Sequence, residues 1–129
     1  MIVEVDTTSP TPPYEQIRGQ VATMIAAGTL PAGAHLPPIR QLAADLGLAA
    51  NTVARAYKEL EVEGLVVSRV RHGTTVTKTA HPLPRAEIRR RLDDAAASYA
   101  TVARQLGVAP DDAEAAIHAA LIAPPPLPS

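Results

Sequence analysis

The chain is 129 residues long, carries a formal net charge of −1 and contains no cysteine. This length suits one small domain with an appendage and leaves no room for a large catalytic domain. The absence of cysteine excludes disulfides and thiolate metal sites. No apolar run approaches the roughly 18 residues that a membrane span requires, and residues 1–6 lack the basic flank of a signal peptide. We therefore expect a cytoplasmic protein that makes no membrane contact.

Three helices are predicted in the first half of the chain, because apolar residues recur there at helical spacing. The first covers about residues 12–27, begins at a proline pair and stops at Gly28. Residues 29–38 form a loop or a short strand. Two shorter helices follow at 38–46 and 51–63, separated by a tight turn at Gly47. Two helices joined in this way are typical of a helix-turn-helix.

A β-hairpin is predicted directly after the third helix. Residues 65–70 and 74–78 are rich in valine and threonine, and they flank Arg71-His72-Gly73. The tip needs a residue at positive φ, which Gly73 supplies. A hairpin in this position is a wing.

The remainder of the chain is predicted to be a helical tail. Residues 81–84 form a proline-containing linker, a long helix covers about 85–106, and a last helix starts at Pro110. Residues 123–129 form a disordered proline-rich end. The expected fold is mainly α with a small β-hairpin. It comprises a winged helix-turn-helix domain (1–80), the linker, a two-helix tail (85–122) and the disordered end.

A polar constellation on the helix at 51–63 predicts contact with DNA. Asn51, Thr52 and Arg55 share one face, because residues three and four apart on a helix are neighbours. The first turns of such a helix enter the major groove. Arg55 could pair with guanine and Asn51 with adenine, or either could bind phosphate, and the sequence leaves both options open. Their helix would bury Val53, Tyr57 and Leu60 on its other side.

Further cations flank this helix. Arg40, near the start of the preceding helix, is placed to grip the DNA backbone. The wing carries Arg69 and Arg71 with His72 and Gly73 at its tip, and a slim glycine tip can approach the minor groove. The expected partner is therefore double-stranded DNA.

The charge of residues 1–80 keeps a rival function open. Seven cations are balanced there by seven acids, so this region is not basic overall. A winged-helix module that binds another protein would need no positive surface. Salt dependence separates the two functions, because a DNA binder releases counterions and loses affinity steeply as salt rises.

Several of these segments together resemble the N-terminal domain of GntR-family regulators. The matching stretches are Pro13-Tyr14-Glu15-Gln16-Ile17, residues 28–33 (GTLPAG), residues 36–43 (LPPIRQLA), residues 51–61 (NTVARAYKELE), residues 63–66 (EGLV) and Gly73-Thr74. The resemblance covers about residues 12–77, and the short helical tail is most similar to the YtrA-like subfamily. A truncated MocR-like protein is a weaker match, because the aminotransferase-like domain is missing.

The resemblance implies roles for particular residues. It assigns DNA contacts to Arg40, Asn51, Thr52, Arg55 and Gly73, with Arg69 as a wing phosphate contact. It also implies a homodimeric regulator on a palindromic operator, often a repressor of its own operon, which in relatives of this tail type commonly encodes a transporter.

The chain departs from the family pattern at three places. Ala49 and Ala50 stand where many relatives carry a polar residue followed by arginine or proline, so this helix is expected either to read thymine methyls instead or to read fewer bases. Arg71 stands where the wing usually has its first glycine. Thr75 stands where phenylalanine is usual, so the wing is expected to be looser against the core.

The tail is expected to form the dimer. Its long helix carries an apolar seam of period 3.5, and the last helix adds a second apolar face. The dimer residues expected are Ile88, Leu92, Tyr99, Val102, Leu106, Ile117 and Leu121. The same seam could instead pack on its own domain or within a self-contained helical hairpin, and Tyr99 could line a pocket for an unknown small-molecule effector.

No enzymatic or metal site is predicted. The sequence has no nucleophile elbow, no phosphate-binding glycine loop and no paired acid–base constellation. The four histidines are scattered without metal-ligand spacing, so no cofactor is expected. The run Arg89-Arg90-Arg91 before Asp93-Asp94 is expected to form i,i+4 ion pairs on a solvated face.

Overall fold

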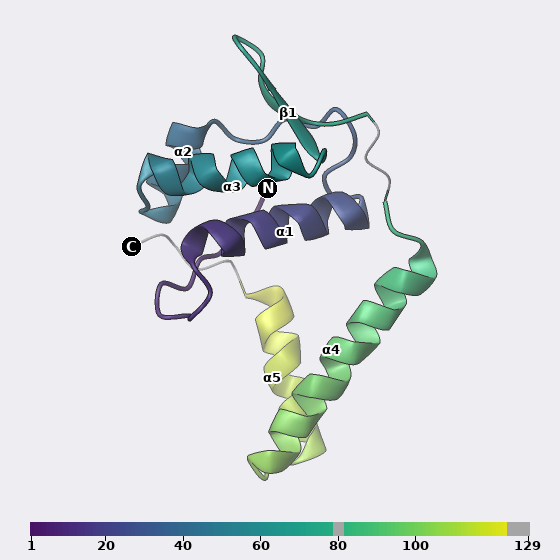
Figure 1. The fold of residues 1–129 in the computed structure, drawn as a ribbon. Coiled ribbons are helices and arrows are strands. Elements are labelled where there is room, and N and C mark those ends of the chain that lie inside the picture. Colours follow the sequence, from purple (N-terminus) through teal and green to yellow (C-terminus); the bar gives the residue numbers. More distant parts are fainter. Residues whose placement is uncertain (79–81, 124–129) are drawn as a thin grey trace. The chain divides into compact units, whose positions relative to one another are not determined.

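The computed structural model describes residues 1–78 and 82–123, so parts of the predicted linker and end lie outside the described residues. The chain divides into two compact units, Met1–Leu83 and a second unit that begins at Pro84. Each unit is described by itself. The first contains α1 (Pro13–Ala27), α2 (Ile39–Leu46), α3 (Ala50–Val62), β1 (Val66–Arg69) and β2 (Gly73–Val76). The second contains α4 (Arg85–Gln105) and α5 (Pro110–Ile122) (Figure 1).

This architecture confirms the predicted fold, mainly α with one antiparallel hairpin. The predicted element ends are shifted by one or two residues. The helix expected at 38–46 begins at Ile39, the helix expected at 51–63 spans Ala50–Val62, and both strands are shorter than expected. In the described residues, no helix is both long and apolar enough to cross a membrane.

A tight turn at Gly47 connects α2 to α3. Gly47 adopts φ 66°, a left-handed conformation that glycine tolerates best. Its amide donates to the carbonyls at the end of α2, and the amide of Leu48 donates to the carbonyl of Ala43. The chain then needs only Leu48 and Ala49 before α3 begins, which fixes the helix-turn-helix geometry.

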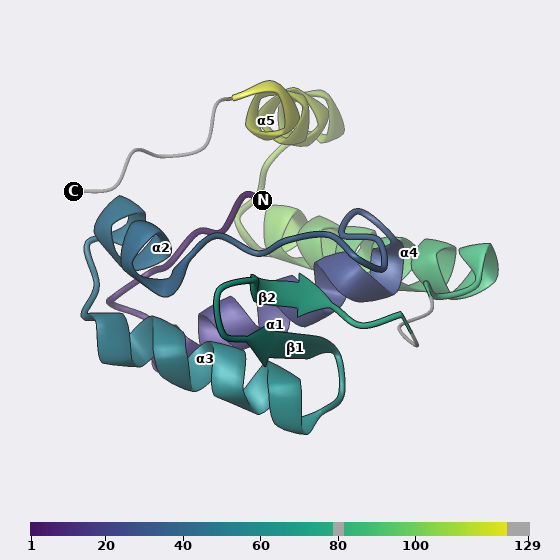
Figure 2. The same cartoon turned by 90° about the horizontal axis from the view of Figure 1, so that it is seen from above.

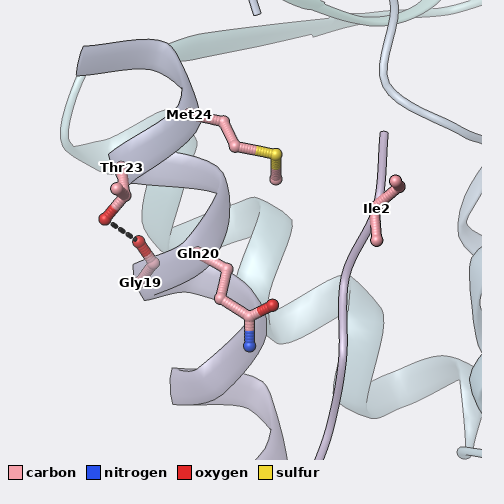
Figure 3. A pocket seen from close by; sticks show the side chains of 5 residues that line it. All are labelled: Ile2, Gly19, Gln20, Thr23 and Met24. Atoms are coloured by element: carbon pink, nitrogen blue, oxygen red, sulfur yellow. Dashed lines mark hydrogen bonds between the residues drawn. The ribbon is translucent and has the colours of Figure 1, made fainter. Parts of the chain in front are cut away.

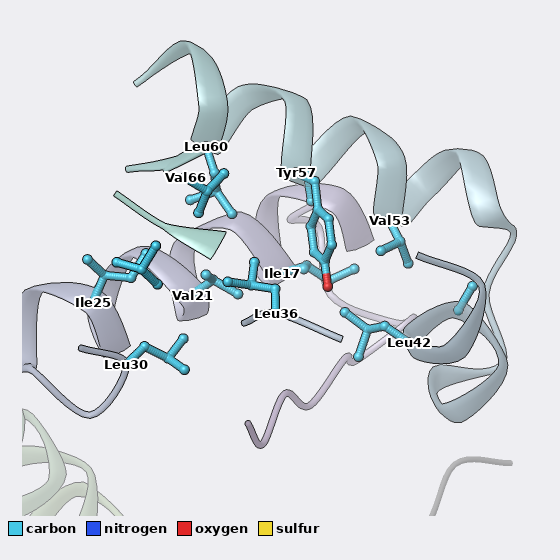
Figure 4. Close-up of a cluster of buried hydrophobic side chains, with 13 residues drawn as sticks. Ile17, Val21, Ile25, Leu30, Leu36, Leu42, Val53, Tyr57, Leu60 and Val66 are labelled. Atoms are coloured by element: carbon cyan, nitrogen blue, oxygen red, sulfur yellow. The ribbon is translucent and has the colours of Figure 1, made fainter. Parts of the chain in front are cut away.

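One hydrophobic core joins the three helices and the hairpin (Figure 4). Its members without exposed surface are Ile17 and Val21 of α1 and Val53, Ala56 and Leu60 of α3, and buried neighbours from α2 and the hairpin complete it. Tyr57 is buried among them, and its hydroxyl donates to the carbonyl of Pro37 at 2.7 Å. Burial raises the pKa of this phenol, so the neutral form that donates this bond is favoured.

The segment before α2 lies beside β2 and forms backbone hydrogen bonds with it, as a third extended segment next to the hairpin. The amide of Gly33 donates to the carbonyl of Val76 at 2.9 Å, and the amide of Val76 donates to the carbonyl of Ala34 at 2.8 Å. His35 pairs with Thr75 as an isolated antiparallel bridge. Of the two structures left open for residues 29–38, this part is strand-like, and Figure 2 shows it running beside β2.

The first six residues form an arm along α1 that the sequence analysis did not anticipate. Gln20 accepts a hydrogen bond from the amide of Glu4 and donates to its carbonyl, at 2.9 Å and 2.6 Å. Gln16 does the same for Asp6, at 2.8 Å for both bonds. Figure 3 shows the hollow left beside the arm, with Ile2 facing Met24; its volume is about 290 Å³.

Candidate nucleic-acid interface

The exposed side of α3 carries the residues predicted to contact DNA. Asn51 and Arg55 are exposed and Thr52 is partly exposed. On the opposite side, Val53, Tyr57 and Leu60 are buried, as the sequence analysis predicted; none of them exposes more than 2% of its surface. Because the buried side fixes the rotation of the helix, its polar residues must face outward.

Arg55 makes two contacts that orient its guanidinium. Its Cζ lies 3.7 Å from the centroid of the Tyr14 ring on α1, a cation–π arrangement. Its Nε lies 3.7 Å from Oε1 of Glu59, one turn further along α3. The side chain is still 61% exposed, so donors remain available to a ligand. The i,i+4 spacing could have predicted the contact with Glu59, whereas the stack on Tyr14 requires the packing of α1 against α3.

The other cations of the first unit divide into two groups. Arg18 pairs with Glu15 at 2.5 Å and with Glu63 at 3.0 Å, and Lys58 lies 3.5 Å from Glu61. No ion pair is found, among the described residues, for the remaining cations of this unit: Arg40, Arg69, Arg71 and Lys78. The acids on and next to α3 are therefore paired with nearby cations. The first unit thus presents unpaired positive side chains although residues 1–80 carry no net charge.

These free cations occupy two places. Arg40 lies in the first turn of α2 and is exposed. The others lie in or directly after the hairpin, whose last paired residues are Arg69 and Gly73. Directly next to this tip pair, the hydroxyls of Ser68 and Thr74 share a 2.8 Å hydrogen bond between the two strands. The predicted wing residues Arg69, Arg71, His72 and Gly73 thus lie together at the hairpin tip. They form a second group of candidate DNA contacts beside the polar face of α3.

The wing tip contains two left-handed residues rather than one. Gly73 has φ 74°, as predicted, and Arg71 has φ 71°. Among the described residues other than glycine, Arg71 alone has a positive φ. A side chain there costs roughly 1–2 kcal/mol, which accounts physically for glycine being usual at this position in the family.

Replacing Arg71 by glycine is expected to raise the free energy of unfolding by roughly 0.5–1 kcal/mol, because the left-handed strain disappears while the unfolded chain gains some freedom. Thermal unfolding followed by circular dichroism would measure this. Arg71→Ala is the control, because alanine removes the charge and keeps the strain. Equal melting temperatures for the glycine and alanine variants would contradict the expected strain.

The apolar seam of the tail is exposed in the single chain. Ile88 is 37% exposed, Leu92 62% and Leu106 72%, and no residue of the two described tail helices is buried. Tyr99 is half-buried and donates its hydroxyl to the carbonyl of Ala113 at 2.7 Å, which ties α4 to α5. An open groove of about 380 Å³ lies at this junction and includes Ile117.

The arginine run of α4 forms the expected ion pairs. Arg89 lies 3.1 Å from Asp93, and Arg90 lies 3.0 Å from Asp94. Glu87, which the sequence analysis did not consider, also bonds Arg90 and Arg91. Hydrogen bonds from these guanidinium groups lower the pKa of Glu87 to about 2, so its carboxylate stays charged well into acid. The arginines of this face are therefore neutralised by acids on the same helix.

Two helices joined by a tight turn and followed by a hairpin with a cationic tip define a winged helix-turn-helix protein. The family model described as "Bacterial regulatory proteins, gntR family" matches residues 13–76. The chain belongs to the GntR family, whose members are DNA-binding transcription regulators and not enzymes. The contacts of individual residues with DNA remain predictions.

Similar proteins include YtrA-like members of this family. The HTH-type transcriptional regulator Rv1152 of Mycobacterium tuberculosis is 43% identical over 111 residues, which cover 86% of this chain and 87% of the relative. The HTH-type transcriptional repressor YtrA of Bacillus subtilis is 38% identical over 79 residues, 61% of either chain. The solved structure of YtrA from Sulfolobus acidocaldarius aligns with a TM-score of 0.56 at 36% identity and covers 75% of this chain and 99% of that one.

Proposed function

We propose that this protein is a homodimeric repressor that binds a palindromic operator in its own or an adjacent operon. The observation that carries the proposal is the sorting of charge in the first unit, where the described cations without an acid partner lie on α2 and in or directly after the hairpin. A surface of this kind attracts phosphate even though the net charge is −1.

In this proposal, α3 enters the major groove with Asn51, Thr52 and Arg55 facing the bases. Arg40 binds phosphate from the start of α2. The hairpin lies along the neighbouring backbone or minor groove with its tip residues Arg69, Arg71, His72 and Gly73. The stack on Tyr14 supports Arg55 as a reader, because a guanidinium already held in one place loses less freedom when it pairs with guanine.

The dimer of this proposal forms through the tail, and the division into a DNA-binding domain (1–80) and a dimerising tail (85–122) is part of the proposal. The exposed seam of α4 supports it, because a single chain leaves these apolar side chains in water. A two-fold dimer presents two copies of α3 to the two half-sites of a palindrome. The name of the YtrA relative, a transcriptional repressor, favours repression over activation.

A small-molecule effector that releases DNA belongs to the same proposal. The groove of about 380 Å³ at the junction of α4 and α5 has the volume of a small ligand site and is lined by Tyr99 and Ile117. An effector that binds there would alter the tail from which the dimer is built.

The experiment uses the full chain and a pool of randomised 30-base-pair duplexes. After rounds of selection, the enriched duplex and an unselected duplex are titrated between 50 and 200 mM salt. We expect a two-fold symmetric enriched sequence, a preference of about a thousandfold over the unselected duplex and a steep loss of affinity with salt.

The matched variants are Arg55→Ala and Arg89→Ala. Both arginines are exposed and each lies beside an acid one helical turn further on, but Arg89 is on the tail. We expect Arg55→Ala to remove most of the preference and Arg89→Ala to leave it unchanged. A pool that never enriches, with weak binding that ignores salt, would favour the rival function, a winged-helix module that binds another protein.

A further inference from the structure

The outer face of the hairpin is a concave surface whose ionisable groups are all basic. Its volume is about 610 Å³, and the described side chains that line it include Arg69, Lys78 and two imidazoles, with no acid among them. Arg69 and His72 are predicted parts of the wing tip. No sequence pattern connects them with Lys78, or with the imidazole of His35 some 35 residues earlier.

The strand register explains why these residues meet. Val66 pairs with Val76, and both side chains are buried in the core. The next pair, Val67 with Thr75, must therefore point outward, because successive side chains alternate between faces. His35 pairs with Thr75 from the other side, so an outward row crosses all three extended segments.

The charged groups flank this row. Arg69 lies two residues from Val67 on the same strand and so shares its face, towards the tip. Lys78 follows β2 at the opposite end of the hollow, and His72 of the tip loop also lines it. No hydrogen bond of the Thr75 hydroxyl is found within the described residues, so a donor is available at the centre of the row.

We propose that this outer hairpin face, formed by His35, Arg69, His72, Thr75 and Lys78, binds a phosphate group of the DNA backbone beside the groove that the wing enters. The inference rests on the proposed function and adds a second phosphate site to it. The chemistry fits, since lysine and arginine bind phosphate and a hydroxyl can donate to its oxygens.

The two imidazoles add hydrogen-bond donors to this surface, because a ring N–H can donate to a phosphate oxygen. The charged groups that face His35 and His72 are Arg69 from β1 and Lys78 from the segment after β2, with no carboxylate among the described lining residues. A phosphate oxygen at this surface would therefore meet no opposing negative side chain.

The first test follows the imidazole C2–H resonances of the full chain by NMR during titration with an unselected 20-base-pair duplex. His118 is the internal control, because it lies on α5 of the tail. We expect the resonances of His35 and His72 to move together and that of His118 to stay in place. A duplex that binds without moving His35 would overturn the site.

The second test measures the slope of log affinity against log salt. Lys78→Ala is expected to lower the magnitude of this slope by about 0.9, the value for one lost phosphate contact. Lys58→Ala is the matched control, because that lysine is exposed but paired with Glu61. His35→Ala combined with His72→Ala should weaken binding to the unselected duplex, because two donors to the phosphate are lost. An unchanged slope for Lys78→Ala would overturn the assignment.

Two further arms separate the sources of phosphate and the two proposals. Pyrophosphate should move the same imidazole resonances only at millimolar concentration; saturation at micromolar concentration, with no response to the duplex, would mean a small phosphorylated ligand and would overturn the DNA assignment. A backbone contact should change the slope equally on selected and unselected DNA. If the protein does not prefer the selected duplex but Lys78→Ala still changes the slope, only the regulator proposal fails. If the protein prefers the selected duplex but Lys78→Ala leaves the slope unchanged, only the hairpin site fails.

Discussion

Replacing Leu92 by aspartate is expected to convert the proposed dimer into a monomer and to weaken binding to the selected duplex by at least about a hundredfold. Leu92 is 62% exposed in the single chain and lies outside the groove where α4 meets α5, so the tail itself should remain folded. A charge on the seam would have to be buried without a partner in the dimer. The loss in DNA affinity follows because each half-site would bind alone, without the effective concentration that linkage supplies.

Sedimentation velocity would give the oligomeric state, and titration of a duplex with one or two half-sites would give the affinities. Ala97→Asp is the matched control, because Ala97 is exposed on the side of α4 opposite the seam. We expect this variant to remain dimeric. If Leu92→Asp also remained dimeric, the dimer would have to form through another surface.

The second large effect is expected in the core of the first unit. Leu60→Ala should lower the free energy of unfolding by about 2–5 kcal/mol, because the removed atoms leave a cavity where α3 packs against α1 and the hairpin. Leu60 has no exposed surface. Small domains are stable by only about 5–15 kcal/mol, so this one side chain supports a large part of the fold that holds α3 in place.

Urea unfolding at a fixed protein concentration would measure the effect, since the stability of the proposed dimer would depend on concentration. Val62→Ala is the control on the same helix, because Val62 is 78% exposed. It should change the stability by less than about 0.5 kcal/mol. Similar losses for both variants would mean that α3 is not anchored through Leu60.

The parts of the fold that could be predicted from the sequence are those set by local rules. Prolines and glycines mark the ends of α1 and α2, and the 3.6-residue period identifies the buried side of α3. Gly73 correctly indicates the wing turn. Arg71 shows the limit of this approach, because its positive φ depends on closing the hairpin and not on its own preference for that conformation.

The features that were not predicted depend on contacts between distant segments. The arm on α1 uses glutamine side chains to replace a backbone ladder, and no sequence period reports such bonds. The stack of Arg55 on Tyr14 joins residues 41 positions apart. The bridge between His35 and Thr75 similarly places two histidines on one surface although they look scattered along the chain.

The sorting of charge in the first unit also affects how such a protein would search a genome. A uniformly basic domain is held by DNA in any orientation and spends much of its time on the wrong sequences. In this chain, the acids that face Arg18 and Lys58 cancel the attraction on those surfaces. Encounters with DNA through those surfaces should be brief. The protein should stay on DNA mainly when α2 and the hairpin contact the backbone first, so the low net charge helps to orient its approach.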